Sequence, residues 1–327
     1  MRRPGYNKWG DVALKGVQRG LCLMSNPITL KIKFMKNSIL AISIAVLCVF
    51  FTGCGKEEAG PTRFAKVSVH FNDFTVTQEE MATKTGVDPA SYDPVTALVL
   101  AFYDAEGTEV YKTTQYKNNG STYTTFGEFT ANLPVGTYTM VALGYAYNDG
   151  DVFTLTSPTQ AAFTSERPRE MFCTTQSVTV TNTNPLDLSV TLNRIVSALQ
   201  IRSTDNRPAG IAKIRTTYAK GGKSFNPSTG LALTDAGFTQ TNNPSAAIGT
   251  AITVTSFPFL YADEETMDIT IEVLDAGDNV LFTHTISNVP FKRNRKTILQ
   301  GAIFTAGASS SAFQLETNWI ADNVVNF

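Results

Sequence analysis

The stretch VTALVLAFYDAEGTEVYKTTQY, residues 95–116, contains the pattern that decides the fold. A long apolar run, Val95 to Tyr103, enters the turn Asp104-Ala105-Glu106-Gly107, and Thr108 to Tyr116 lead back. An apolar run of this kind, which is too short for a typical helix, is rich in β-branched and aromatic residues and ends at a turn containing Gly, is typical of a strand. The stretch therefore predicts two strands joined by a tight turn.

Segments on either side extend this β pattern. Residues Ala65 to Val76 alternate, with Val67, Val69 and Phe71 on one face and mostly polar residues between them, as in a half-buried strand. Leu133 to Ala142 indicate a tight turn that enters another alternating strand. No stretch keeps an apolar period of 3.6 residues over three turns, so we expect helices to be few and short. The sequence predicts an all-β fold.

The second half of the chain repeats the theme. Met267 to Leu274, the turn Asp275-Ala276-Gly277-Asp278 and Val280 to Ile286 mirror the hairpin of residues 95–116. Such an internal echo indicates duplication, and strands at this spacing favour β-sandwiches. We place the boundary near Leu192-Asn193-Arg194-Ile195, which gives two tandem sandwiches at residues 65–194 and 195–327. Ala219 to Ile248, rich in Gly, Asn, Pro and Ser, should form a long and weakly structured excursion.

The N-terminal region reads as an export signal. A 13-residue apolar run, Ile39 to Phe51, follows three lysines and precedes Thr52-Gly53-Cys54. A basic start, an apolar run of this length and small residues at the cut describe a secretory signal peptide, and the run is short for a membrane span of ~20 residues. Phe51-Thr52-Gly53-Cys54 resembles the lipobox of bacterial lipoproteins, which predicts lipid on Cys54. A plain signal peptide is the alternative.

These assignments define a signal region at 1–53 and a lipidated tether at 54–64. Residues 1–34 resemble neither signal nor domain, so we expect translation to begin at Met24 or Met35. Cleavage before Cys54 removes eight of 27 basic and one of 28 acidic residues and leaves a net charge near −8. Nucleic acid is therefore an unsuitable partner, because duplex binding needs a basic face. Cys173 is the only other cysteine of the mature chain, so no internal disulfide can form.

Chemistry-bearing residues are few. His70 and His284 are the only histidines, each inside an expected strand, and Cys173 is expected to be buried. Catalytic motifs such as HExxH and GxSxG are missing from the sequence, which predicts neither an enzyme nor a cofactor or metal site. Two acidic segments, Asp263-Glu264-Glu265 with Asp268 and Asn148-Asp149-Gly150-Asp151, are expected to be hairpin ends before they are cation sites, since they lack the spaced ligands of a calcium loop.

Three surface features offer binding hypotheses. Lys56, Glu57 and Glu58 follow the lipid site and form either an export tag or a solvated tether. Lys292, Arg293, Arg295 and Lys296 form a dense basic cluster, which is either a turn that guards a sheet edge or a docking patch for an acidic neighbour or for lipopolysaccharide phosphates. An exposed aromatic platform would indicate glycan binding, and its candidates are Trp319 with Tyr103, Tyr123, Tyr145 or Tyr147.

Four motifs occur in a fixed order: the lipobox with its acidic tag, Leu133 to Tyr138, Leu192 to Ser197, and Asn288 to Thr297. Together they resemble the fimbrillin superfamily, in particular its minor, membrane-anchoring fimbrial subunits. The resemblance implies two transthyretin-like β-sandwiches, assembly by β-strand exchange with other fimbrial subunits, and no catalysis. An unpaired sheet edge recruits a partner's strand through main-chain hydrogen bonds.

Within that family, stalk subunits lose their first strand through a cut after Arg, whereas anchors keep strand and lipid. The loop Thr77 to Pro94 contains Lys84 but no Arg, and Arg63 precedes the first strand, which favours an anchor or accessory subunit. We therefore expect an outer-membrane protein, held by the lipid (palmitate) on Cys54, that is exposed on the cell surface or built into fimbriae and supports adhesion. A surface glycan-binding lipoprotein is the alternative. The tail, Ala312 to Trp319 with Ile320 to Phe327, either completes the second sandwich or is donated to a neighbour.

Overall fold

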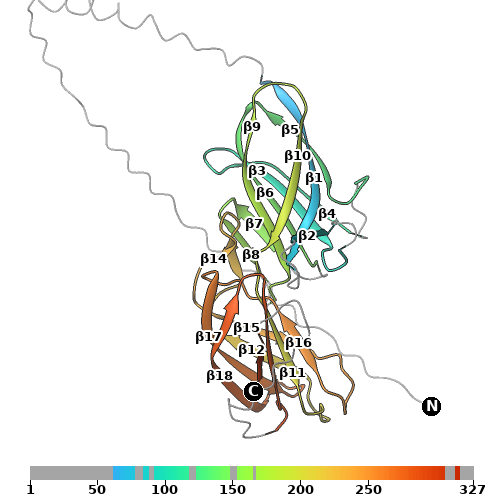
Figure 1. Cartoon of the computed structure of the whole chain (residues 1–327), viewed down its shortest axis with the longest axis vertical. Coiled ribbons are helices and arrows are strands. Elements are labelled where there is room, and N and C mark those ends of the chain that lie inside the picture. Colours follow the sequence, from blue (N-terminus) through green and yellow to red (C-terminus); the bar gives the residue numbers. More distant parts are fainter. Residues whose placement is uncertain are drawn as a thin grey trace, which may run out of the picture. The chain divides into compact units, whose positions relative to one another are not determined.

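The computed structural model describes residues 62–77, 84–87, 92–117, 123–147, 153–164, 167–305 and 314–316 (Figure 1). The signal region, the tether up to residue 61, Trp319 and the tail 320–327 lie outside the described residues. No helix occurs in the described part, so the prediction of an all-β fold is confirmed. Within the same residues, no helix is long and apolar enough to cross a membrane.

Eight strands of the first half form one continuous sheet that contributes both walls of a sandwich. The order is β2-β1-β10-β9-β6-β3-β4, with β5 paired to β1. Because β9 and β10 pair only through Asn193 with Cys173 and Arg194 with Phe172, the sheet divides there into two walls. One wall consists of β1 (Phe64–Thr77), β2 (Lys84–Val87), β5 (Glu128–Pro134) and β10 (Leu186–Arg194), and the other of β3 (Ala97–Tyr103), β4 (Glu109–Tyr116), β6 (Gly136–Tyr145) and β9 (Met171–Val180).

A core fills the space between these walls. Alternating residues of β1 and β5, among them Val67, Val69 and Phe129, are buried against Leu100 and Met140 of the opposite wall. The polar residues between them face outward, as the period of two in β5 requires. Burial of these side chains removes apolar surface from water. Each Å² of apolar surface buried stabilises the sandwich by roughly 25 cal/mol.

A third layer covers the outer face of the second wall. Four short strands in the order β14-β13-β8-β7 form this sheet: β7 (Phe153–Ser157), β8 (Gln160–Phe163), β13 (Ser224–Asn226) and β14 (Leu231–Ala232). Phe225 and Phe163 of this layer pack with Val99 and Ala101 of β3 in a second core. Strand β3 is consequently buried on both faces, which is why the run that ends at Tyr103 is almost continuously apolar.

The remaining strands build a sandwich with a core of its own. One sheet has the order β16-β11-β19-β20 and the other β15-β12-β17-β18. Ile201, Ile214, Ile271 and Leu299 are among the residues buried between them. The strands are β11 (Ala198–Ser203), β12 (Lys213–Tyr218), β15 (Phe238–Asn242), β16 (Thr253–Ser256), β17 (Glu264–Leu274), β18 (Val280–Lys292), β19 (Lys296–Gly301) and β20 (Gln314–Glu316).

The two sandwiches repeat one topology. In each, the first strand pairs in parallel with a strand from near the end of that half (β1 with β10, β11 with β19) and antiparallel with the strand that precedes the second hairpin of the opposite sheet (β5 or β16). The opposite sheets run β4-β3-β6-β9 and β15-β12-β17-β18, so β17 and β18 occupy the places of β6 and β9. The hairpins β3–β4 and β17–β18, which echo each other in sequence, are therefore not topological counterparts.

What these two hairpins share is the chemistry of their turns. The Asp104 carboxylate accepts hydrogen bonds from the backbone N–H groups of Glu106 and Thr108, at 3.1 and 2.7 Å. The Asp275 carboxylate accepts from those of Gly277 and Asn279, at 2.8 and 2.9 Å. An Asp side chain that bonds its own backbone two residues on stabilises a turn wherever a hairpin needs one, so the same motif can recur at different positions in a fold.

The expectation for residues 219–248 is wrong. This segment contains β13, β14 and β15, and two of these strands complete the third layer. Several of its Gly residues lie in the turns between the strands: Gly221, Gly230 and Gly237 have positive φ. The division at residue 194 stays a prediction, because β7 and β8 share a sheet with β13 and β14 from beyond it.

Candidate functional site

The first sandwich has two seams where the edges of its walls meet, and they differ. At one seam, Gln115 of β4 bridges to the other wall: its amide donates to the carbonyl of Glu128 at 2.7 Å, and its side-chain oxygen accepts from the N–H of Gly127 at 2.8 Å. The Tyr111 hydroxyl adds a bond to the carbonyl of Thr130 at 3.0 Å. These side chains supply the contacts that a backbone ladder would have made, so this seam is closed.

The other seam, between residues 174–180 of β9 and residues 186–192 of β10, is open. No backbone ladder of the described chain joins these two segments, although Thr174 donates a side-chain hydrogen bond to the carbonyl of Thr191. A pocket of about 210 Å³ lies at its far end, lined by residues that include Thr179, Asn182 and Leu186. We call these segments the β9–β10 seam. Its edges carry unpaired strand positions, with the half-buried Leu186 and Leu188 beside the core.

A buried ionic cluster lies where the β9–β10 seam closes. The guanidinium of Arg194 donates to Glu170 Oε1 through Nε at 2.8 Å and through Nη2 at 2.7 Å, and the two side chains are only 2% and 9% exposed. Nη2 also donates to the Tyr92 hydroxyl at 3.0 Å and Nη1 to Asn294 Oδ1 at 2.9 Å. The Arg194 carbon Cζ lies 4.9 Å from the ring centre of Phe172, a cation–π contact. The buried positive charge of Arg194 is thus balanced by the negative charge of Glu170, and each of its three guanidinium nitrogens donates a hydrogen bond.

Tyr92 belongs to the same cluster. Its hydroxyl donates to Glu170 Oε1 at 2.9 Å. Burial, reinforced by the negative charge of Glu170, raises the pKa of Tyr92 to about 12. The hydroxyl consequently stays protonated and available as a donor at any physiological pH. Asn294, which lies in the middle of the basic cluster of the sequence, ties this group to the turn between β18 and β19.

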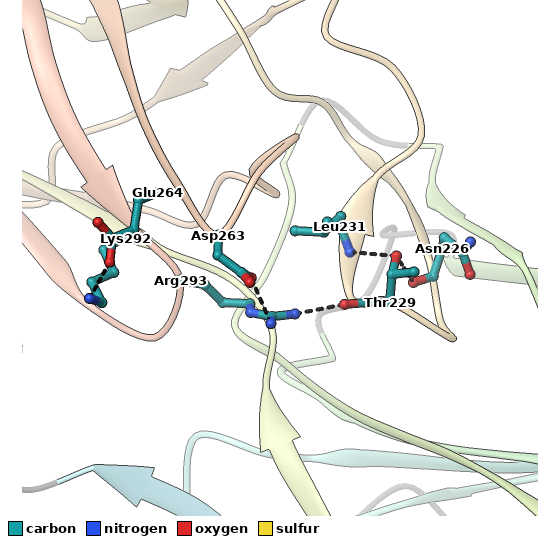
Figure 2. A network of polar contacts seen from close by, with 7 residues as sticks. All are labelled: Asn226, Thr229, Leu231, Asp263, Glu264, Lys292 and Arg293. Atoms are coloured by element: carbon teal, nitrogen blue, oxygen red, sulfur yellow. Dashed lines mark hydrogen bonds and ion pairs between the residues drawn. The ribbon is translucent and has the colours of Figure 1, made fainter.

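That turn contains the predicted docking patch. Lys292 is paired with Glu264, and Arg293 Nη2 lies 2.6 Å from Asp263 Oδ1. Figure 2 shows Arg293 between Asp263 on one side and Thr229 on the other, where Nη1 donates to the Thr229 carbonyl at 2.6 Å. The acidic loop of the sequence is thus the ionic partner of the basic turn. Docking of an acidic neighbour on this patch stays a prediction.

The other members of the two charged segments have local roles. Asp268 accepts from the N–H of Asn288 at 2.9 Å, and Glu265 from that of Tyr261 at 3.1 Å. The backbone carbonyl of Arg295 accepts from the N–H of Ala198 at 2.9 Å, and Lys296 begins β19. Among the described residues, no group of three or more His, Cys, Asp and Glu side chains is placed to hold a metal ion. Residues 148–151 lie outside the described part.

A pocket of about 460 Å³ lies between the closed end of the β9–β10 seam and the basic turn. Ile195, directly after β10, and Arg293, in the basic turn, lie where the first sandwich meets the second, and we call this place the junction. Gly230, on the loop between β13 and β14, has a φ of +73° and approaches the junction so closely that a Cβ would lie 2.8 Å from Ile195 Cγ2 and 2.9 Å from Arg293 Nη1. The loop is therefore packed firmly onto the junction. The pocket is lined by Cys173, Thr174, Thr175, Asn193, Arg194, Ile195, Pro227, Ser228, Thr229, Gly230, Arg293 and Asn294.

The candidate nucleophile and bases have structural contacts. Cys173 is buried, donates to the carbonyl of Pro227 at 3.3 Å, and has a pKa raised to about 12 by burial. A thiol in such surroundings is not activated, since the thiolate is the nucleophile. His284 is buried with Nε2 3.0 Å from the Ile303 carbonyl, and the half-buried His70 has Nδ1 3.8 Å from Glu128 Oε1.

The described tyrosines of the glycan hypothesis do not form an exposed platform. Tyr103 and Tyr145 are buried in the core beneath the third layer. Tyr123 and Tyr147 are half-buried against the two cores of the first half. Trp319, Cys54 and the tag Lys56-Glu57-Glu58 lie outside the described residues, so lipidation and the export tag stay predictions.

Two features of the site were not foreseen. Glu170 and Arg194 are 24 residues apart, and the only local signal was a charged residue at the edge of each of two apolar segments. Gln115 sits in an ordinary polar run, where its amide cannot be distinguished from a solvated one.

Residues 61–323 match the model of a family described as a family of unknown function, DUF6562. No curated protein matches the sequence. Among solved structures, a candidate polysaccharide-binding protein (DUF1812) from Bacteroides thetaiotaomicron is 14% identical with a TM-score of 0.47, covering 78% of this chain and 96% of that chain. A candidate adhesin from Bacteroides ovatus is 10% identical with a TM-score of 0.48, covering 79% and 96%.

The fimbrial anchor protein Mfa2 from Porphyromonas gingivalis is also similar, at 11% identity and a TM-score of 0.47, with 78% of this chain and 97% of that chain covered. Each of these three solved structures is something this chain is similar to, at a sequence identity of 14% or less.

Proposed function

We propose that this chain, which belongs to the DUF6562 family of unknown function, is a surface lipoprotein that serves as an anchor or accessory subunit of a fimbria. In this proposal Cys54 carries the lipid that holds the protein in the outer membrane, Lys56-Glu57-Glu58 directs it to the cell surface, and other fimbrial subunits are its partners. Its role is structural and adhesive, without catalysis or a cofactor.

The observation that supports this role is the open β9–β10 seam. Strand edges that lack a ladder partner bind extended segments of other chains through main-chain hydrogen bonds. Residues 171–184 contain no charged residue, no proline and no glycine, so nothing in the sequence of β9 guards its edge. The opposite seam is closed by Gln115. We infer that a neighbouring subunit adds its strand at the β9–β10 seam.

A charge on the edge tests this assembly mode. Ser177→Lys with Thr179→Lys places two cations on the exposed positions of β9, and these should repel or mis-register an incoming strand while the fold is retained. Fimbriae purified from such cells should lack the protein, or be shed into the medium, while its amount in the membrane fraction is unchanged.

Thr137→Lys with Thr139→Lys is the matched control. These residues lie opposite Thr179 and Ser177 in the ladder, and Thr137 contacts Thr179 through its hydroxyl at 3.2 Å, so this variant breaks the same contact and adds the same two charges, but on β6, which pairs with β9 along this stretch. It should assemble normally. If the two variants assemble equally well, strand addition at the β9–β10 seam is wrong.

Lipid attachment is tested separately. Cys54→Ala should move the protein from the membrane fraction to the soluble fraction, because acyl chains contribute ~0.8 kcal/mol per buried CH₂. A Cys54→Ala protein that still sediments with outer membranes would contradict the lipid anchor.

The export tag is tested in a second variant. Replacement of Lys56-Glu57-Glu58 by three alanines should leave the protein in the membrane but hide it from protease added to whole cells.

A further inference from the structure

The end of the first sandwich where β1 begins exposes apolar side chains that the core does not use. Phe64 is 55% exposed and is the only exposed phenylalanine among those whose side chains the structure describes. Val135, at the turn between β5 and β6, is 44% exposed. The N–H of Val135 donates to the carbonyl of Arg63 at 2.9 Å, and Phe64 faces Pro134 across the ladder, so turn and strand start lie side by side.

Cationic side chains flank this apolar end. Arg63 precedes Phe64 and Lys66 follows it, and both are exposed. An exposed aromatic and an exposed aliphatic residue with Lys and Arg beside them match the chemistry of a lipid interface: the apolar groups enter the boundary of the acyl chains while the cations stay among the phosphates. Single exposed apolar residues are common on protein surfaces. A second observation, the distance of this group from Cys54 along the chain, therefore has to show whether the group can contact a membrane.

Chain length supplies that position. Nine residues separate Cys54 from Phe64, and at about 3.3–3.6 Å per residue the ten steps between them reach no further than roughly 36 Å. A lipid on Cys54 therefore keeps this end of the sandwich close to the bilayer in every conformation of the tether. The exposed apolar residues of the second sandwich, such as Val280, are not kept near the bilayer by the length of the tether.

We propose that Phe64, Pro134 and Val135, flanked by Arg63 and Lys66, form a membrane-resting tip that contacts the lipid surface and sets the orientation of the anchored protein. The proposal rests on the lipid anchor at Cys54. The occupant of this surface is a bilayer, with its phosphates as the ligands of the two cations.

Tryptophan placed in the tip reports on the contact. The full lipidated protein with Phe64→Trp, reconstituted into vesicles with brominated lipids, should lose much of the added emission to quenching and show a blue shift relative to the parent protein, whose Trp319 provides the baseline. Val280→Trp is the control, because Val280 is as exposed as Val135 (44%) but lies on β18 of the second sandwich. Its added emission should not be quenched.

The outcomes separate the two proposals. A protein that sediments with vesicles through Cys54 but shows no quenching at Phe64→Trp overturns the tip and leaves the anchor intact. Equal quenching at both positions also overturns it, since it reports adsorption without orientation. A protein with an intact Cys54 that fails to sediment removes the anchor and the tip together.

Discussion

Arg194 illustrates how a single buried charge can depend on its partner. Its guanidinium reaches Glu170, Tyr92 and Asn294, so it connects the second wall of the first sandwich to the turn after β18. Arg194→Ala would leave the Glu170 carboxylate buried and unpaired, which typically costs 3–5 kcal/mol, so we expect a loss of about that size in the free energy of unfolding. Urea denaturation measures it.

The control for this prediction removes both charges. Arg194→Met with Glu170→Gln should cost clearly less than Arg194→Ala alone, because replacing a whole buried pair by neutral groups avoids the unpaired charge. A single Arg194→Ala variant as stable as the native protein would show that the ionic cluster does not stabilise the junction.

Cys173 permits a chemical test of the same region. With its pKa raised to about 12 by burial, the thiol should resist iodoacetamide in the folded protein at pH 8 and react once urea unfolds it. The folded pKa lies above the ordinary value of 9.0, so this group contributes its full stability below pH 9 and loses it as the pH rises towards 12. Rapid alkylation of the folded protein would contradict the packing of Cys173 against Pro227.

At the scale of elements, Gln115 joins the edges of β4 and β5. Gln115→Ala should leave the Glu128 carbonyl and the Gly127 N–H without their partner at the closed seam, at a cost of about 1–3 kcal/mol. Val110→Thr, an exposed substitution on the same strand, should change the free energy of unfolding by no more than about 0.5 kcal/mol. Thermal unfolding of the two variants, compared side by side, distinguishes a structural bridge from an ordinary surface amide.

The loop between β13 and β14 can be tested through its glycine. Gly230→Ala should be destabilising twice over, because a side chain at positive φ costs ~1–2 kcal/mol and its Cβ would also press on Ile195 and Arg293. Gly210→Ala shares the positive φ, at +88°, but has open space around it. The difference between the two variants therefore measures how firmly the loop packs on the junction, and equal losses would mean that it does not.

The sequence predicted elements better than their partners. The hairpin of residues 95–116 was legible because its strands are neighbours in the chain and its turn carries its own Asp. Strands β13 and β14 were missed because each is only two or three residues long and gains its apolar contacts from Phe163 and Phe259, far away in sequence. The same limit hid the pairing of Arg194 with Glu170, since composition carries no information on which buried charge meets which.

At the scale of the whole molecule, the third layer ties the two halves together. Strands β7 and β8 of the first half share a sheet with β13 and β14 of the second, and Phe225 and Phe259 cover the outer face of β3. We therefore expect the two sandwiches to unfold in a single cooperative transition. A fragment that ends at Arg194 should bind a hydrophobic dye strongly and lack a sharp transition, because this face of β3 would be exposed to water. A fragment as stable as the intact chain would support two independent domains instead.

The pairing of β1 has a mechanical consequence. The strand is held by β5 over Phe64–His70 and by β10 over Val67–Thr75. A pull on the tether acts along the axis of β1, so it loads these backbone hydrogen bonds together in shear and does not peel them away one at a time. In the proposed role as an anchor subunit, a force carried down the filament would therefore be resisted by the whole length of β1 at once, which makes this strand a mechanical clamp.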